Sequence, residues 1–153
     1  MPIETRDILL KTLKSFWGYD AFRESQEDII LSILEQNDTL VLLPTGGGKS
    51  LCYQLPALVL EGTCLVISPL FALMKDQVSH LKDLGIEAEY LSSELDEAEQ
   101  EEIYEKAISG EIKLLYVSPE RLHNSLFIRK MLDVSLSFIA VDEAHCISEW
   151  GQD

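Results

Sequence analysis

The sequence predicts an α/β fold in which a parallel sheet is covered by helices on both faces. Two observations lead to this prediction. Short, continuous apolar segments alternate with segments of helical periodicity, and a glycine-rich loop joins one apolar segment to the helix that follows it. Continuous apolar runs are typical of strands that are buried on both faces of a sheet. With 46% hydrophobic and 25% charged residues, the 153-residue chain has an ordinary globular composition and is long enough for one domain.

Two helices and a strand are expected before the glycine-rich loop. Residues 5–17 have apolar side chains at helical spacing, and Gly18 ends that helix. Ser25 stands where it can cap a second helix. The inner face of this second helix is apolar and consists of Ile29, Ile30, Ile33 and Leu34. A polar turn then leads into an apolar strand at residues 39–43.

After the loop, helices and strands alternate. Helices are expected at residues 49–60 and 70–84, in the acidic stretch that begins with residues 94–105 and is closed by Gly110, and in a short form at 120–132. Strands are expected at residues 63–68, 87–91, 113–117 and 137–141. This alternation is typical of parallel sheets, whose ligands bind at the carboxyl ends of the strands.

Charge and cysteine usage restrict the possible partners. The formal net charge of −15 repels nucleic acid at long range, so any contact with DNA must be local or be made by other parts of the protein. No apolar run approaches the roughly 18–20 residues of a membrane span, which indicates a soluble, cytoplasmic protein without membrane partners. The three cysteines are far apart and form no C-x-x-C pair, so we expect no zinc site in this segment.

The glycine-rich loop, LPTGGGKS at residues 43–50, predicts a binding site for the phosphates of a nucleotide. Glycines let consecutive N–H groups point at one anion, and the positive end of a helix lies behind them. Lys49 adds a charge for the β- and γ-phosphates, and Ser50 offers a hydroxyl to Mg²⁺. The candidate residues are Thr45, Gly46, Gly47, Gly48, Lys49 and Ser50. The general phosphate-loop pattern begins with glycine, where this chain has Leu43.

A second candidate cluster, DEAH at residues 142–145, follows the apolar strand SFIAV. A carboxylate at the end of a buried strand is costly unless it faces a cation. Asp142 is therefore a candidate ligand of the magnesium ion held by Ser50. Glu143 can orient and deprotonate an attacking water molecule. His145 completes the set of candidate catalytic residues Lys49, Asp142, Glu143 and His145.

The stretches PTGGGKSLCYQLPAL and DEAHCISEWG together resemble the RecQ branch of the superfamily-two ATP-dependent DNA helicases. The resemblance implies a RecA-like P-loop domain with ATP and Mg²⁺ as cofactors. It also implies that FWGYDAFRESQEDII, at residues 16–30, reads adenine: Tyr19 stacks on the base, Gln26 bonds its edge and Arg23 helps to hold the nucleotide. The family usually has Pro-Gly at the turn where this chain has Glu24 and Ser25.

The resemblance also implies residues that contact DNA. SPLFALMKDQV, at residues 68–78, and LLYVSPERL, at residues 114–122, resemble the family's two motifs for the DNA backbone. In the first, Ala72 replaces a usual serine. CISEWG after DEAH resembles the start of an aromatic loop that couples DNA binding to hydrolysis. The candidate nucleic-acid contacts are Ser68, Pro69, Lys75, Arg121 and Trp150.

By this resemblance the 153 residues form the N-terminal portion of the ATP-binding lobe, truncated after the DEAH strand, with the second lobe and the zinc-binding and winged-helix regions absent. The implied function is that of an ATP-dependent 3′-to-5′ DNA helicase, which acts in DNA repair and recombination in the bacterial cytoplasm or nucleoid. Its DNA is single-stranded and partly duplex. The chain alone is expected to bind Mg-ATP at most. The alternatives are a non-enzymatic nucleotide-binding fragment and an RNA helicase or translocase of the same superfamily.

Overall fold

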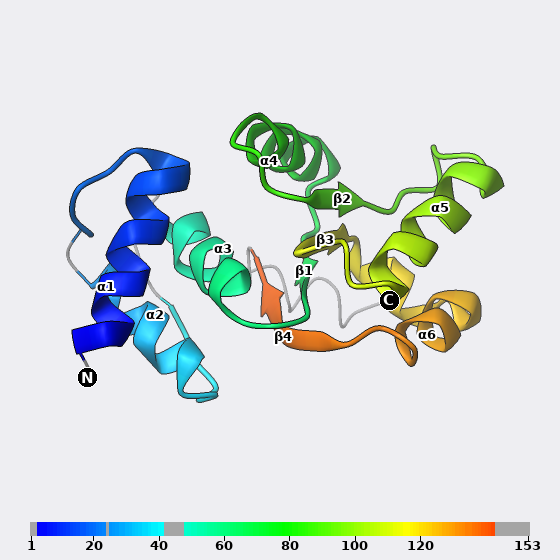
Figure 1. Ribbon diagram of the computed structural model, residues 1–153. Coiled ribbons are helices and arrows are strands. Elements are labelled where there is room, and N and C mark those ends of the chain that lie inside the picture. Colours follow the sequence, from blue (N-terminus) through cyan, green and yellow to red (C-terminus); the bar gives the residue numbers. More distant parts are fainter. Residues whose placement is uncertain (1–2, 24, 42–47, 143–153) are drawn as a thin grey trace. The chain divides into compact units, whose positions relative to one another are not determined.

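The computed structural model describes residues 3–23, 25–41 and 48–142 and divides the chain into two compact units (Figure 1). One unit, Met1–Glu61, holds three α-helices in its described part, and the other, Gly62–Asp153, holds the sheet. Each unit is described by itself. Within the described residues, no helix is long and apolar enough to cross a membrane.

The helical unit is built around five buried apolar side chains. Its helices are α1 (Ile3–Thr12), α2 (Gln26–Leu34) and α3 (Lys49–Val59), and α1 continues into a π-helical turn, η1 (Leu13–Trp17). The expected stop at Gly18 is confirmed, because this residue has a φ of 77° and its N–H closes the turn onto the carbonyls of Leu13 and Lys14. The core side chains are Leu9, Leu13, Ile30, Leu51 and Leu55. Since they come from α1, η1, α2 and α3, this core packs the helices of the unit together.

Ser25 does not cap α2 as expected from its residue type. It occupies the position before the helix, but its φ of 72° is left-handed and its hydroxyl makes no capping hydrogen bond. A side-chain cap needs an extended backbone at that residue, which a left-handed residue does not have. The turn before α2 therefore uses a conformation that favours glycine.

The expected strand at residues 39–43 is wrong for its described part. Thr39–Val41 lie outside every strand, Leu40 is 77% exposed, and the Thr39 hydroxyl hydrogen-bonds the Asn37 carbonyl at 3.0 Å and lies 2.8 Å from the Ser32 hydroxyl. Leu42 and Leu43 lie outside the described residues. A strand needs a neighbouring ladder, and the described strands all belong to the other unit. An apolar run alone was not enough to predict one here.

The second unit contains a four-stranded parallel sheet, which confirms the predicted fold class. Its strands are β1 (Thr63–Ile67), β2 (Ala88–Tyr90), β3 (Leu114–Val117) and β4 (Leu136–Val141), arranged in the order β2-β3-β1-β4. In the register, Cys64 of β1 lies opposite Leu114 on one side and Phe138 on the other. All four strands therefore end at the same edge of the sheet.

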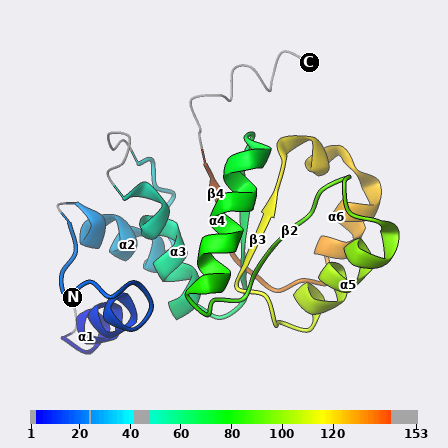
Figure 2. The same cartoon turned by 90° about the horizontal axis from the view of Figure 1, so that it is seen from above.

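Helices cover both faces of this sheet. Figure 2 shows α4 (Phe71–Asp83) on one side and α5 (Glu97–Ile108) with α6 (Ser125–Met131) on the other. A 3₁₀ turn, η2 (Pro119–His123), precedes α6. The face below α5 and α6 forms one apolar core, made by Leu65, Ile67, Leu91, Ile103, Tyr104, Ala107, Ile112, Leu115, Val117, Phe127 and Val134. The observed helices and strands fall within a few residues of the predicted bounds.

Candidate nucleotide and nucleic-acid site

The phosphate-loop residues that the structure describes stand at the start of α3. Gly48 has a left-handed backbone with a φ of 79°, and the helix begins at the next residue, Lys49. Leu51 and Leu55 anchor α3 in the core of the helical unit, so Lys49 and Ser50 lie in its first turn. The first N–H groups of a helix have no partner within it and attract anions. Thr45, Gly46 and Gly47 lie outside the described residues.

Gln26 connects the predicted adenine-reading segment to the phosphate loop. Its side chain is 3% exposed. The amide oxygen accepts a hydrogen bond from the Arg23 N–H at 2.8 Å, and the amide nitrogen donates one to the Gly48 carbonyl at 3.3 Å. An amide has two lone pairs and two N–H hydrogens, so these contacts use one of each. The structure thus brings together Gln26 and Gly48, which are 22 residues apart in sequence.

Gly48 cannot be replaced by a larger residue without a local shift. A Cβ atom added there would collide with the Gln26 amide nitrogen, and the left-handed φ would strain it further. The backbone beside Lys49 and Ser50 therefore passes close to Gln26 and has no side chain of its own in the way. A left-handed glycine directly before the helix suits a phosphate loop, which must present N–H groups rather than side chains.

The other two predicted adenine residues lie at the surface of the same unit. Tyr19 is 53% exposed, and Arg23 is exposed as well. A cavity of about 410 Å³ is lined by this segment, including Arg23 and Phe22. Of the three residues predicted to hold the adenine nucleotide, Arg23 lines this cavity, whereas Tyr19 and Gln26 do not.

Asp142 lies directly after β4, at the carboxyl edge of the sheet. Its N–H donates to the Ile67 carbonyl of β1 at 2.8 Å, and the side chain of Gln77 in α4 reaches one carboxylate oxygen at 3.5 Å. Sequence reasoning missed Gln77, although this residue belongs to the stretch at residues 68–78. Glu143, His145 and Trp150 lie outside the described residues.

The predicted DNA contacts of this unit differ in how accessible they are. The Ser68 side chain is 1% exposed, and its hydroxyl has no hydrogen-bond partner among the described residues, while its N–H bonds the Val117 carbonyl at 2.9 Å. Pro69 is partly buried and Lys75 is exposed. Arg121 donates to the Gln100 amide oxygen of α5 at 3.1 Å. Ser68 could therefore reach DNA only after a local rearrangement.

The sequence matches a family model over residues 23–153, and that model is described as DEAD/DEAH box helicase. The chain belongs to the DEAD/DEAH box helicase family. The matched residues include Gln26, the phosphate loop and the DEAH cluster. Membership of this family agrees with the RecA-like fold that was predicted.

Among the members of this helicase family, RecQ proteins are similar over nearly the whole chain. The ATP-dependent DNA helicase RecQ of Haemophilus influenzae is 51% identical over 144 residues, which cover 94% of this chain and 23% of that protein. The RecQ protein of Bacillus subtilis is 47% identical over 145 residues, which cover 92% of this chain and 24% of that protein. The predicted resemblance to RecQ helicases is confirmed. The chain spans about a quarter of the length of these curated relatives.

Solved helicase structures have the same fold. The DUF1998 helicase MrfA bound to DNA superposes with a TM-score of 0.72 at 20% identity, covering 92% of this chain and 21% of that one. A hypothetical ATP-dependent RNA helicase from Sulfolobus tokodaii superposes with a TM-score of 0.70 at 23% identity, covering 95% of this chain and 43% of that one. At this level of identity the likeness shows the fold alone.

Proposed function

We propose that this chain is the ATP-binding part of an ATP-dependent 3′-to-5′ DNA helicase of the RecQ type, which acts on single-stranded and partly duplex DNA in the cytoplasm. The observation that carries the proposal is the contact between Gln26 and Gly48. It joins a segment suited to read adenine to the loop suited to bind phosphates, in a chain of the helicase family. The similarity to proteins named ATP-dependent DNA helicase RecQ supports DNA as the substrate.

The residues present fit Mg-ATP as the cofactor. Gly48 precedes Lys49 at the start of α3, and the charge of Lys49 suits the β- and γ-phosphates. Ser50 and Asp142 are the residues that would hold Mg²⁺, and Glu143 is the one that would orient the water. Hydrolysis of Mg-ATP held there would supply the free energy that drives movement along DNA. Tyr19 and Gln26 would select the base, while Arg23 would hold the nucleotide.

The role of the phosphate loop can be tested in the full-length protein by Lys49→Ala. Charge-assisted hydrogen bonds contribute about 1.5–3 kcal/mol, so we expect Mg-ATP affinity to fall about 10- to 100-fold in titration calorimetry. Lys11→Ala is the matched control, because Lys11 is an exposed lysine of the same unit. Equal affinity in Lys49→Ala and the wild type would contradict the proposed site.

The nucleic-acid substrate is tested by the rate of ATP hydrolysis. We expect single-stranded DNA to stimulate hydrolysis by the wild type, and Lys49→Ala to remove that stimulation. Stimulation by RNA but not by DNA would favour the RNA helicase alternative instead. If hydrolysis does not occur in the presence of either nucleic acid, the motor function itself is refuted.

A further inference from the structure

Two aromatic rings and a lysine form a cluster at the start of α4. Phe71 and Tyr90 meet edge to face, with ring centroids 5.8 Å apart and planes inclined by 75°. The Lys75 ammonium group lies 5.4 Å from the centroid of the Phe71 ring. Both rings are partly exposed and Lys75 is exposed, while the neighbouring Leu70 is 47% exposed. We call Phe71, Lys75 and Tyr90 the aromatic platform.

The aromatic platform lies at the edge of the sheet where ligands are expected. Tyr90 is the last residue of β2, and Phe71 begins the helix that follows β1. Both strands run parallel to β3, so their carboxyl ends point to the same edge. Asp142, after β4, stands at that edge too. Open parallel sheets bind their ligands there.

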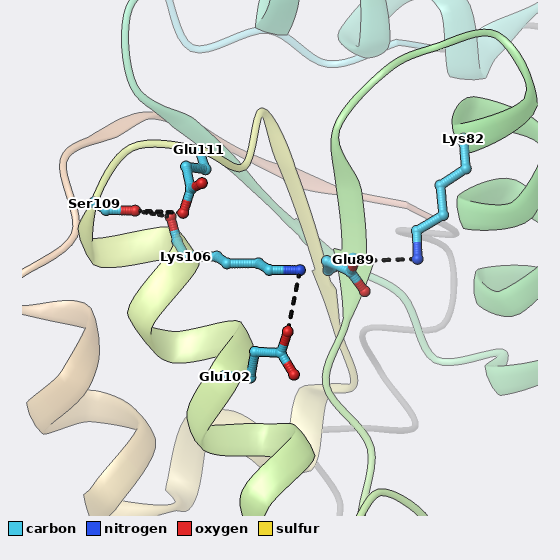
Figure 3. Close-up of polar contacts among 6 residues, drawn as sticks. All are labelled: Lys82, Glu89, Glu102, Lys106, Ser109 and Glu111. Atoms are coloured by element: carbon cyan, nitrogen blue, oxygen red, sulfur yellow. Dashed lines mark hydrogen bonds and ion pairs between the residues drawn. The ribbon is translucent and has the colours of Figure 1, made fainter.

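The elements that carry the platform are fixed to each other. Below it, α4 buries Met74, Val78 and Leu81. At the other end of α4, Lys82 forms a 3.0 Å ion pair with Glu89 of β2, one residue before Tyr90 (Figure 3). The two elements are therefore packed together where their rings meet, and a surface already formed lowers the cost of binding a ligand.

We propose that the aromatic platform stacks an unpaired base of single-stranded DNA, with Lys75 placed for the adjacent phosphate. The proposal rests on the proposed function and adds a base-binding subsite to it. With a net charge of −15, this chain neutralises few phosphates, whereas stacking on a ring does not depend on charge. Both rings are partly exposed, and Phe71 lies beside a cation, so a base can approach the rings while its phosphate meets Lys75.

The proposal separates base contacts from phosphate contacts, so it can be tested with two oligonucleotides. Binding of the full-length protein to a thymidine oligonucleotide is compared with binding to an abasic oligonucleotide of equal length, by fluorescence anisotropy. We expect Phe71→Leu and Tyr90→Leu to weaken binding to the thymidine oligonucleotide about 5- to 100-fold and to leave abasic binding unchanged. Phe71→Tyr retains a ring and should bind like the wild type.

Lysine variants provide the matched charge control. Lys75→Gln should weaken binding to both oligonucleotides and reduce the slope of log affinity against log salt by about one. Lys106→Gln removes a similar charge from α5, where Lys106 pairs with Glu102 (Figure 3), and should change neither. Thermal unfolding of each variant checks that it is folded. If Phe71→Leu does not fold, Phe71→Tyr and Tyr90→Leu still decide the question.

The outcomes distinguish this inference from the function on which it rests. If both leucine variants keep the wild-type ratio of thymidine to abasic affinity, the platform does not bind bases, although the protein binds DNA. If the leucine variants lower the ratio of base-containing to abasic affinity only when the oligonucleotides are RNA, the assignment to DNA is overturned. If the wild type binds neither DNA oligonucleotide, the proposed helicase function fails first.

Discussion

Replacing Gln26 tests the link between adenine recognition and the phosphate loop. In the structure its buried amide accepts from the Arg23 N–H at 2.8 Å and donates to the Gly48 carbonyl at 3.3 Å. Gln26→Ala removes both hydrogen bonds. At about 1 kcal/mol for each, the free energy of unfolding of the helical unit should fall by about 2 kcal/mol. Urea unfolding measures this change.

Replacing Gln26 should also change the preference for Mg-ATP over Mg-GTP. An amide can accept from the adenine amino group and donate to a ring nitrogen, whereas a carboxylate can only accept. We expect Gln26→Ala to reduce the preference for Mg-ATP over Mg-GTP about 5- to 100-fold, from the loss of two hydrogen bonds of about 0.5–1.5 kcal/mol each. Gln26→Glu retains the acceptor for Arg23 but places a buried carboxylate against the Gly48 carbonyl, so it should lose the preference and cost at least as much stability as Gln26→Ala.

Titration calorimetry of the full-length protein with both nucleotides decides between the two roles. Unchanged preference together with lower stability in Gln26→Ala would show that the residue only joins two segments. Unchanged preference and unchanged stability would refute the reasoning as a whole, because the two hydrogen bonds would then contribute nothing measurable.

Two further predictions concern the turn before α2 and the buried thiols. Because Ser25 has a left-handed φ of 72°, Ser25→Gly should raise the free energy of unfolding by about 1 kcal/mol in urea, whereas Ser25→Ala, which retains the strained backbone, should give no gain. Burial raises the pKa of the Cys52 thiol from its ordinary value of 9.0 to about 11. The unfolded thiol therefore loses its proton first, so the contribution of Cys52 to stability should be constant below pH 9 and fall between pH 9 and about 11, a fall that Cys52→Ala should remove. A pH-independent difference between wild type and Cys52→Ala would contradict this.

Much of the fold could be predicted because it follows from local patterns. Apolar spacing located the helices, and continuous apolar runs located three of the four strands, whereas the short strand β2 was found in the mixed segment at residues 87–91. Lys49 and Ser50 could be placed at a helix start because glycines precede them. The same reasoning failed at residues 39–43, since whether an apolar run forms a strand depends on a neighbour that the run itself does not specify.

The contacts that shape the candidate site could not be predicted in this way. Gln26 meets Gly48, and Gln77 meets Asp142, across 22 and 65 residues of sequence. Such pairs depend on which elements lie side by side. The stretch at residues 68–78 suggested Lys75 as a DNA contact, but that the ammonium group lies over the ring of Phe71 became apparent only from the structure.

The central position of β1 has a consequence for how the protein is made. All five residues of β1 are buried, yet its partners β3 and β4 come much later in the chain, with Cys64 opposite Leu114 and Phe138. Parallel neighbours of this kind cannot form from adjacent hairpins, and such non-local pairing slows folding. During synthesis, the apolar strand β1 cannot complete its pairing until β4 has emerged from the ribosome. In this interval we expect the nascent chain to depend most on chaperones.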